Sequence, residues 1–155
     1  MKERKILLAH GAGGKLSHDL INEMFLPFLQ NRILSSLDDS AVIYNGKAHL
    51  AFTTDSYVVK PLFFPGGDIG RLSICGTVND LAMAGSQPLG ISTSFIVEEG
   101  FSTEELERIL SSIEKAASEA GVNVVAGDTK VVEHGAAEGL FITTSGVGMV
   151  PLGID

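Results

Sequence analysis

The stretch FFPGGDIGRLSICGTVNDLAMAG, residues 63–85, predicts a loop that leads into a largely buried helix. The proline and glycines near its start are typical of loops. Apolar and small residues then dominate over 71–84, and Gly85 is typical of the position that follows a helix. Asp80 lies within this apolar helix, where an unpaired carboxylate would cost several kcal/mol. We therefore expect a positive group to meet Asp80.

The sequence on both sides of this helix alternates strand and helix patterns. Apolar residues recur every four positions from Leu16 to Phe28, which is the spacing of one helix face. Asn45-Gly46 predicts a hairpin, because this pair accepts the positive φ values of a tight turn. The expected elements are a helix over 16–29, strands over 41–45 and 48–54, the helix over 71–84, a strand over 89–99, a helix from the Ser102 cap to Gly121, and strands over 122–127 and 139–150. This order predicts an α+β fold in which helices cover one face of a mixed β-sheet.

Composition narrows the class of protein. The chain has 155 residues, 45% of them hydrophobic, and 18 glycines, as expected of one compact domain with many tight turns. Its net charge of −8 argues against nucleic acid as a partner. A single cysteine, Cys75, allows no internal disulfide. We find no signal peptide and no apolar stretch as long as a membrane span, and we expect a cytoplasmic protein with no membrane partner.

Five aspartates stand beside otherwise apolar segments. They are Asp38, Asp39, Asp55, Asp80 and Asp128, and only the last has a basic residue within two positions. Local ion pairing therefore does not account for the set. Hard oxygen ligands on separate segments suit Mg²⁺, and we interpret the set as a site for Mg²⁺ that carries the phosphates of a nucleotide. Taken alone, Asp38 is as typical of a turn residue or helix cap as of a metal ligand, and Asp128 after Gly127 is also typical of a turn.

The glycine-rich segment GAGGK, residues 11–15, has two open interpretations. Its backbone N–H groups face a phosphate at the start of a helix, or it is simply a flexible turn. The segment is not a P-loop, because Ala9 replaces the first glycine and Leu16 follows the lysine. The four histidines lack the spacing of a zinc site, and we expect Cys75 to be a small buried apolar side chain.

Several motifs together resemble a known family. DDSAV, TTD, VNDLAMAG and GDTK, in this order, resemble the N-terminal ATP-binding domain of the superfamily that contains aminoimidazole ribonucleotide synthetase, selenophosphate synthetase and thiamine monophosphate kinase. LAHGAGGK, TTDSYVVKPLFFPGGDIG, ICGTVNDLAMAG, FIVEEGF and GDTKVV are similar to the HypE family, the carbamoyl dehydratases of nickel–iron hydrogenase maturation. This resemblance covers nearly the whole chain.

The resemblance implies a PurM-like fold whose sheets pair into a barrel in a homodimer, with ATP and Mg²⁺ as cofactors. It implies that ATP dehydrates an S-carbamoyl group on a C-terminal cysteine to thiocyanate, the source of the cyanide ligands of the hydrogenase. Its implied partners are the carbamoyltransferase HypF and the HypC–HypD complex. The implied metal ligands are the five aspartates, the implied catalytic residues are Asp80 and Lys130, and the implied cofactor-binding residues are Asp38, Asp39, Thr53, Thr54, Asp55, Asn79, Asp80, Gly127, Asp128, Thr129 and Lys130.

Members of this family carry a second domain and a terminal cysteine, so we expect residues 1–155 to be the N-terminal ATP-binding and dimerisation domain only. Two alternatives stay open. One is another ATP-dependent enzyme of the superfamily, of the small-molecule kinase or selenophosphate synthetase type. The other is a non-catalytic module that assembles maturation partners.

Overall fold

The computed structural model describes residues 5–46 and 48–151. The chain divides into two compact units, Met1–Asp38 and Asp39–Asp155. The single unit expected from the sequence is therefore the second of these, preceded by a separate helical segment.

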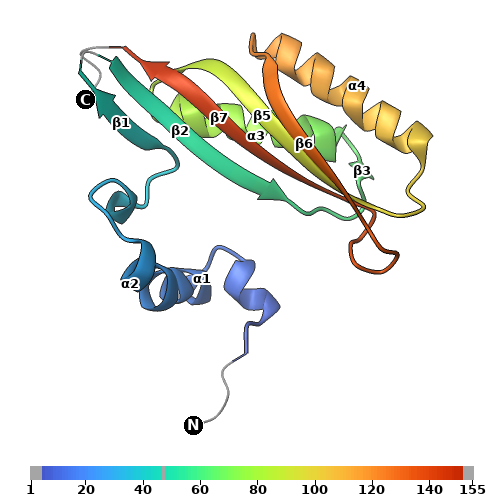
Figure 1. Cartoon of the computed structure of the whole chain (residues 1–155), viewed down its shortest axis with the longest axis horizontal. Coiled ribbons are helices and arrows are strands. Elements are labelled where there is room, and N and C mark those ends of the chain that lie inside the picture. The colour runs from blue at the N-terminus through green and yellow to red at the C-terminus, as the bar shows by residue number, and fades with distance from the viewer. Residues whose placement is uncertain (1–4, 47, 152–155) are drawn as a thin grey trace. The chain divides into compact units, whose positions relative to one another are not determined.

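The first unit is a series of short helices, coloured blue in Figure 1. They are η1 (Leu8–Gly11), α1 (Lys15–Leu20), η2 (Ile21–Phe25), α2 (Leu26–Leu29) and η3 (Leu34–Ser36), and none of them contains a buried residue. The expected helix over 16–29 is confirmed, but its middle, η2, is a π-helix in which Leu26 N–H bonds to Ile21 O. Pro27 follows in the first turn of α2. Because proline has no N–H to donate, a change from α-helical to π-helical hydrogen bonding just before Pro27 is expected.

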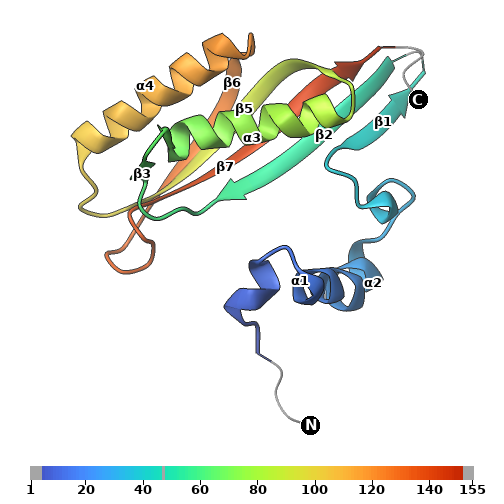
Figure 2. The same cartoon turned by 180° about the vertical axis from the view of Figure 1, so that it is seen from behind.

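The second unit is a five-stranded sheet with two helices. The strand order is β1-β2-β7-β5-β6, where β1 is Ala41–Asn45, β2 Ala48–Tyr57, β7 Leu140–Val150, β5 Gln87–Glu98 and β6 Val124–Val132. All neighbours are antiparallel except β5 and β6, which are joined through α4 (Thr103–Glu119). Both α4 and α3 (Ile69–Met83) lie on the same face of the sheet, and the described residues of this unit place no helix on the other face (Figures 1 and 2). The expected mixed sheet covered on one face is confirmed.

Three elements differ from the sequence-based expectation. The segment 63–68, expected as a loop, contains a small hairpin of β3 (Phe63–Phe64) and β4 (Gly67–Asp68). Strand β2 continues to Tyr57. Strand β6 continues through Asp128 to Val132, because these residues pair with β5, so the turn that Asp128 suggests by itself is wrong. Pairing with a neighbouring strand overrides the local preference of glycine and aspartate for turns.

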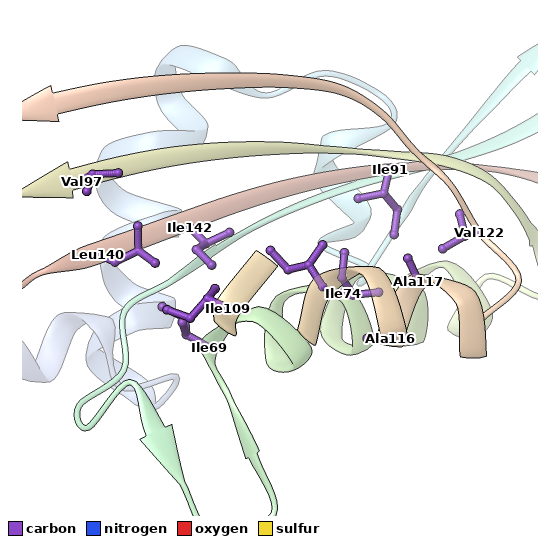
Figure 3. Packing of buried hydrophobic residues seen from close by; sticks show 11 residues of the cluster. Ile69, Ile74, Ile91, Val97, Ile109, Ala116, Ala117, Val122, Leu140 and Ile142 are labelled. Carbon is purple, nitrogen blue, oxygen red and sulfur yellow. The ribbon is translucent and has the colours of Figure 1, made fainter. Parts of the chain in front are cut away.

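The core lies between the sheet and its two helices. The main cluster of the core has eleven buried residues from α3, α4, β5, β7 and the segment before β6, and ten of them are labelled in Figure 3. A second, smaller cluster consists of Ala51, Leu81 and Val150. The N-cap of α4 forms as expected, with Glu105 N–H donating to Ser102 Oγ at 3.3 Å. Helix α3 is buried along one side only, since Met83 is 73% exposed, so the expectation of a largely buried helix holds for one face of it. Within the described ranges, no helix is long and apolar enough to cross a membrane.

Candidate functional site

Asp80 lies near the C-terminal end of α3, beside the start of the second unit and strand β2. The hydroxyl of Thr53 is 3.1 Å from Asp80 Oδ2 and 3.0 Å from the backbone oxygen of Asp39. Ser40 Oγ donates to the backbone oxygen of Asp80 at 2.7 Å. Two hydroxyls therefore tie residues 39 and 40, β2 and α3 together at this point.

Asp55 follows two residues after Thr53 on β2, on the same face of the sheet, because side chains alternate along a strand. Its Oδ2 accepts a hydrogen bond from the Tyr57 hydroxyl at 3.1 Å and is 3.5 Å from Thr77 Oγ1. Thr77 Oγ1 is 2.5 Å from Thr144 Oγ1, and both residues are fully buried. A row of hydroxyl groups thus connects Asp55 to the interior between α3 and β7.

The electrostatics of this cluster are repulsive. Burial, followed by the charges of Asp55 and Asp39, raises the pKa of Asp80 above its usual value. Burial also raises the pKa of Tyr57 to about 12, so the phenol stays protonated at neutral pH. Among the described residues, the ion pairs are Lys60–Glu138, Arg71–Glu119 and His134–Glu98, and none of them includes one of the five aspartates. Within the described part of the chain, the carboxylates by α3 thus have no cationic side chain as an ion-pair partner, and their charge is available to a bound cation.

The other predicted residues do not join this cluster. Across the sheet, Asp55 is opposite Thr144, Thr144 is opposite Thr93, and Thr93 is opposite Gly127. Gly127 therefore lies three strands away from Asp55, which is about 14 Å for a strand spacing near 4.8 Å. Asp128 is the next residue, and its side chain is on the opposite, helix-free face.

Lys130 shares the helix-free face with Asp128, whereas Thr129 lies on the helix face of the exposed strand β6. Thr54 is also on the helix-free face, where its hydroxyl accepts from Ser145 Oγ at 2.9 Å. Asn79 is exposed on α3 beside Asp80. Asp38 is the last residue of the first unit.

One chain does not gather the five aspartates into a single metal centre. Within residues 5–46 and 48–151, no three His, Cys, Asp or Glu side chains lie close enough to hold a metal ion. Mg²⁺, however, is usually held by one or two carboxylates together with substrate phosphates and water. The paired carboxylates of Asp55 and Asp80 fit this smaller donor set.

Two other predicted features are placed by the structure. In the GAGGK segment, Gly13 N–H donates to Ser17 Oγ at 2.9 Å, so one of its backbone donors already has a partner. Cys75 packs against the main core as a small apolar side chain, as expected, but it is half-buried rather than buried.

A groove of about 450 Å³ lies between α4 and the strands β5 and β6. Its lining is mostly apolar, including Phe95, Leu110 and Ile113. The groove contains none of the aspartates, so we do not place the predicted chemistry in it.

Sequence reasoning missed four residues of the Asp55–Asp80 cluster, namely Ser40, Tyr57, Thr77 and Thr144. Only Tyr57 carries a readable signal, because in TTDSY it stands two positions after Asp55 and so on the same side of the strand. The other three are ordinary hydroxyl residues. Thr77 and Thr144 meet through the packing of α3 on β7, and Ser40 joins from the segment before β1 through its hydrogen bond to Asp80 O.

Comparison with known proteins places this geometry in a family. A family model described as AIR synthase related protein, N-terminal domain, matches residues 37–150. Carbamoyl dehydratase HypE of Cupriavidus necator is 52% identical over 99% of this chain and 44% of its own length. Carbamoyl dehydratase HypE of Escherichia coli is 46% identical over 96% of the chain and 46% of its own length. The chain therefore spans less than half the length of these curated relatives.

Solved structures agree with this placement. HypE in a complex with HypF is 50% identical, with a TM-score of 0.82 over 86% of this chain and 43% of that one. HypE in complex with ATP is 49% identical, with a TM-score of 0.67 over 96% of this chain and 44% of that one. A ThiL structure with AMPPCP and TMP, at 19% identity and a TM-score of 0.68, shares the fold alone. Because the family model matches most of the sequence, the chain belongs to the AIR synthase related family as its N-terminal domain.

Proposed function

We propose that this chain is the N-terminal ATP-binding domain of a carbamoyl dehydratase that serves hydrogenase maturation. The observation that carries the proposal is the pairing of Asp55 and Asp80 beside α3 with no cationic side chain among the described residues. A similar protein, 49% identical, has been solved with ATP. Paired carboxylates without a counter-ion are what a magnesium nucleotide requires, since the ion then supplies the missing positive charge.

The reaction proposed for the whole protein is the dehydration of an S-carbamoyl cysteine. The carboxamide oxygen attacks the γ-phosphoryl group of ATP and releases ADP. The phosphorylated oxygen then leaves as phosphate while the nitrogen loses its protons, and the carbon–nitrogen triple bond of a thiocyanate results. Asp39, Asp55 and Asp80 would hold Mg²⁺, which when bound neutralises charge on the transferred phosphoryl group. The chain's own work is to orient these carboxylates, as expected for a reaction that depends on positioning.

Asp128, Thr129 and Lys130 enter this proposal through a second copy of the chain. In one copy they lie on the edge strand β6, three strands from Asp55. The helix-free face of the sheet exposes apolar side chains such as Phe52 and Ile96, and β1 and β6 are the edge strands of the sheet that the described residues form. A two-fold dimer through this face and these edges would bury that apolar surface. It would also bring β6 of one copy toward the site of the other.

HypF and the HypC–HypD complex are the partners we propose for the whole protein. A 50% identical HypE has been solved with HypF, and the similarity covers 86% of this chain. That complex also keeps open a role of this domain in assembly rather than catalysis. Partner binding that is equally strong with and without Mg-ATP would favour the assembly role.

The first experiment is a calorimetric titration of Mg-ATP into the 155-residue chain, repeated with EDTA. We expect saturable binding that depends on the metal. A flat titration with Mg²⁺ present would contradict nucleotide binding by this domain.

The same chain is expected to form no thiocyanate by itself when it is incubated with ATP and the carbamoyl-donating partner. Cys75 is half-buried on α3 and packs against the core, so its thiol lacks the mobility that a carbamoyl carrier needs. Mass spectrometry decides this point. A carbamoylated or cyanated Cys75 would contradict the assignment of the carrier to a different cysteine.

A further inference from the structure

Asp55 is held by one phenol rather than by the whole row of hydroxyls around it. The shortest contact of Thr77 Oγ1 is with Thr144 Oγ1, at 2.5 Å, where either hydroxyl can be the donor. Thr144 Oγ1 also lies 3.2 Å from the backbone oxygen of Ser73. The 3.5 Å separation of Thr77 Oγ1 from Asp55 Oδ2 is then a weak contact at best. The Tyr57 hydroxyl, at 3.1 Å, is left as the donor to Asp55.

Gly76 provides the space that this phenol needs. It lies inside helix α3, where glycine is unfavourable by about 1 kcal/mol relative to alanine. A Cβ atom built on Gly76 would overlap the hydroxyl of Tyr57 and touch its ring. An alanine at this position would therefore push the hydroxyl away from Asp55. A helix that accepts an unfavourable residue at this point indicates that the position of the phenol matters.

The hydrogen bond engages only one of the two carboxylate oxygens. The contacts of Asp55 with the hydroxyls of Tyr57 and Thr77 both end on Oδ2. The other close polar neighbour of the Asp55 carboxylate is the carboxyl group of Asp80. A neutral phenol fixes the orientation of the carboxylate and leaves its negative charge in place. An arginine or lysine at this position would neutralise that charge. The arrangement resembles the outer partners of metal ligands, which fix a ligand's orientation while leaving its charge for the metal.

We propose that Tyr57 is a positioning residue that, through the space left by Gly76, orients Asp55 so that its second oxygen is available to the Mg²⁺ of a bound nucleotide. This inference rests on the proposed function. It assigns to the chain a residue that acts on nucleotide binding without touching the nucleotide.

The test compares two changes that each remove one phenolic oxygen. Tyr57→Phe is expected to weaken Mg-ATP binding by about 10–100-fold, the usual effect of losing an outer partner of a metal ligand. Tyr44→Phe is the matched control, because Tyr44 is exposed on β1 and packs edge-on against His49 outside the cluster. It should bind as the wild type does. Calorimetric affinities and thermal unfolding are measured for both variants.

Gly76→Ala separates positioning from a general loss of packing. The change keeps the side chains of Tyr57 and Asp55 and is expected to displace the phenol of Tyr57. It should therefore weaken Mg-ATP binding as much as Tyr57→Phe does. Combined with Tyr57→Phe it should add only a small packing cost, because the hydroxyl, its nearest contact, is then absent and only the ring atoms lie close to the new Cβ. A purely structural role predicts instead that the two losses multiply and that they follow the melting temperature.

The outcomes distinguish this inference from the function on which it rests. If the wild-type chain does not bind Mg-ATP, the proposed function falls and this inference falls with it. If the wild type binds and folded Tyr57→Phe binds equally well, the positioning role alone is overturned. Weaker binding in Tyr57→Phe and Gly76→Ala, without a further loss in the double variant, supports it.

Discussion

Two acidic segments of this chain look alike in sequence and differ in structure. Asp55 and Asp80 meet between β2 and α3, where hydroxyls hold them and burial raises the pKa of Asp80. Asp128 and Lys130 lie on the exposed edge strand β6, on the opposite face of the sheet. Among the described residues, the first segment brings two carboxylates together, whereas the second lies three strands away from them. This separation is the reason for our proposal that the site is shared between two copies of the chain.

The largest effect is expected from Asp80→Asn in the first of these segments. The change replaces a proposed metal ligand with a neutral amide of the same shape, so Mg-ATP should bind at least 10–100-fold more weakly, the range known for outer partners of ligands. Without nucleotide the variant should melt at a higher temperature, because burial and the charges of Asp55 and Asp39 disfavour the ionised Asp80. Calorimetry and thermal unfolding measure the two effects. Wild-type affinity in this variant would remove Asp80 from the site.

The proposal that β6, with Asp128, contributes to the nucleotide site of a second copy is tested by mixing two variants that each bind Mg-ATP poorly. Asp80→Asn and Asp128→Asn should each bind Mg-ATP poorly by themselves. If β6 serves the partner's site, equal mixing and re-equilibration should restore about a quarter of the sites, since half of the dimers are mixed and each has one intact site. Nucleotide binding before and after mixing gives the answer. No recovery, with heterodimers demonstrated, would place both aspartates in the same copy's site or Asp128 outside it.

Much of the fold was predictable, because it follows from periodic patterns. The helix over 16–29, the helix after Asp68 and the cap at Ser102 all follow from spacing and local chemistry. The extension of β6 through Asp128 did not follow, since it depends on pairing with β5, which is distant in sequence.

The same division applies to the site. Asp80 was marked by its apolar surroundings, which local sequence reveals. Thr77 and Thr144 were not marked, because a buried threonine looks the same in sequence whether it packs or donates a hydrogen bond. The separation of Asp128 from Asp55 depends on strand order, which the motifs do not encode.

A smaller effect is expected from Phe52→Lys on the helix-free face. Phe52 is 44% exposed on β2, and a charge at this position should oppose burial of the face against a second copy. Sedimentation at tens of micromolar should show a dimer for the wild type and a shift toward monomer for the variant. Leu110→Lys is the matched control, since Leu110 is also 44% exposed but lies on α4. A monomeric wild type would remove the basis for a shared site.

The smallest effect concerns Glu98, an acid at the end of β5 that, unlike Asp80, is fully supplied with donors. Its carboxylate accepts from Gly135 N–H at 2.6 Å and from Gly139 N–H at 2.9 Å, so it holds the connection between β6 and β7. These two backbone hydrogen bonds lower the pKa of Glu98 from its usual 4.5, and the one from Gly135 has the larger effect. Between the lowered pKa of Glu98 in the folded chain and its usual pKa in the unfolded chain, the unfolded chain therefore binds more protons than the folded chain.

Glu98 thus stabilises the fold above its unfolded pKa, and this contribution is lost as the pH falls through the lower folded value. Glu98→Gln, whose amide has one accepting oxygen in place of two, should lower the melting temperature slightly at pH 7. The difference from the wild type should shrink as the pH falls below 4.5, because the wild-type carboxylate then becomes protonated as well. Glu99→Gln, at the exposed neighbouring position, should show no such trend. A melting-temperature difference for Glu98→Gln that stays constant from pH 7 to pH 3 would show that packing, rather than the charge of Glu98, holds this connection in place.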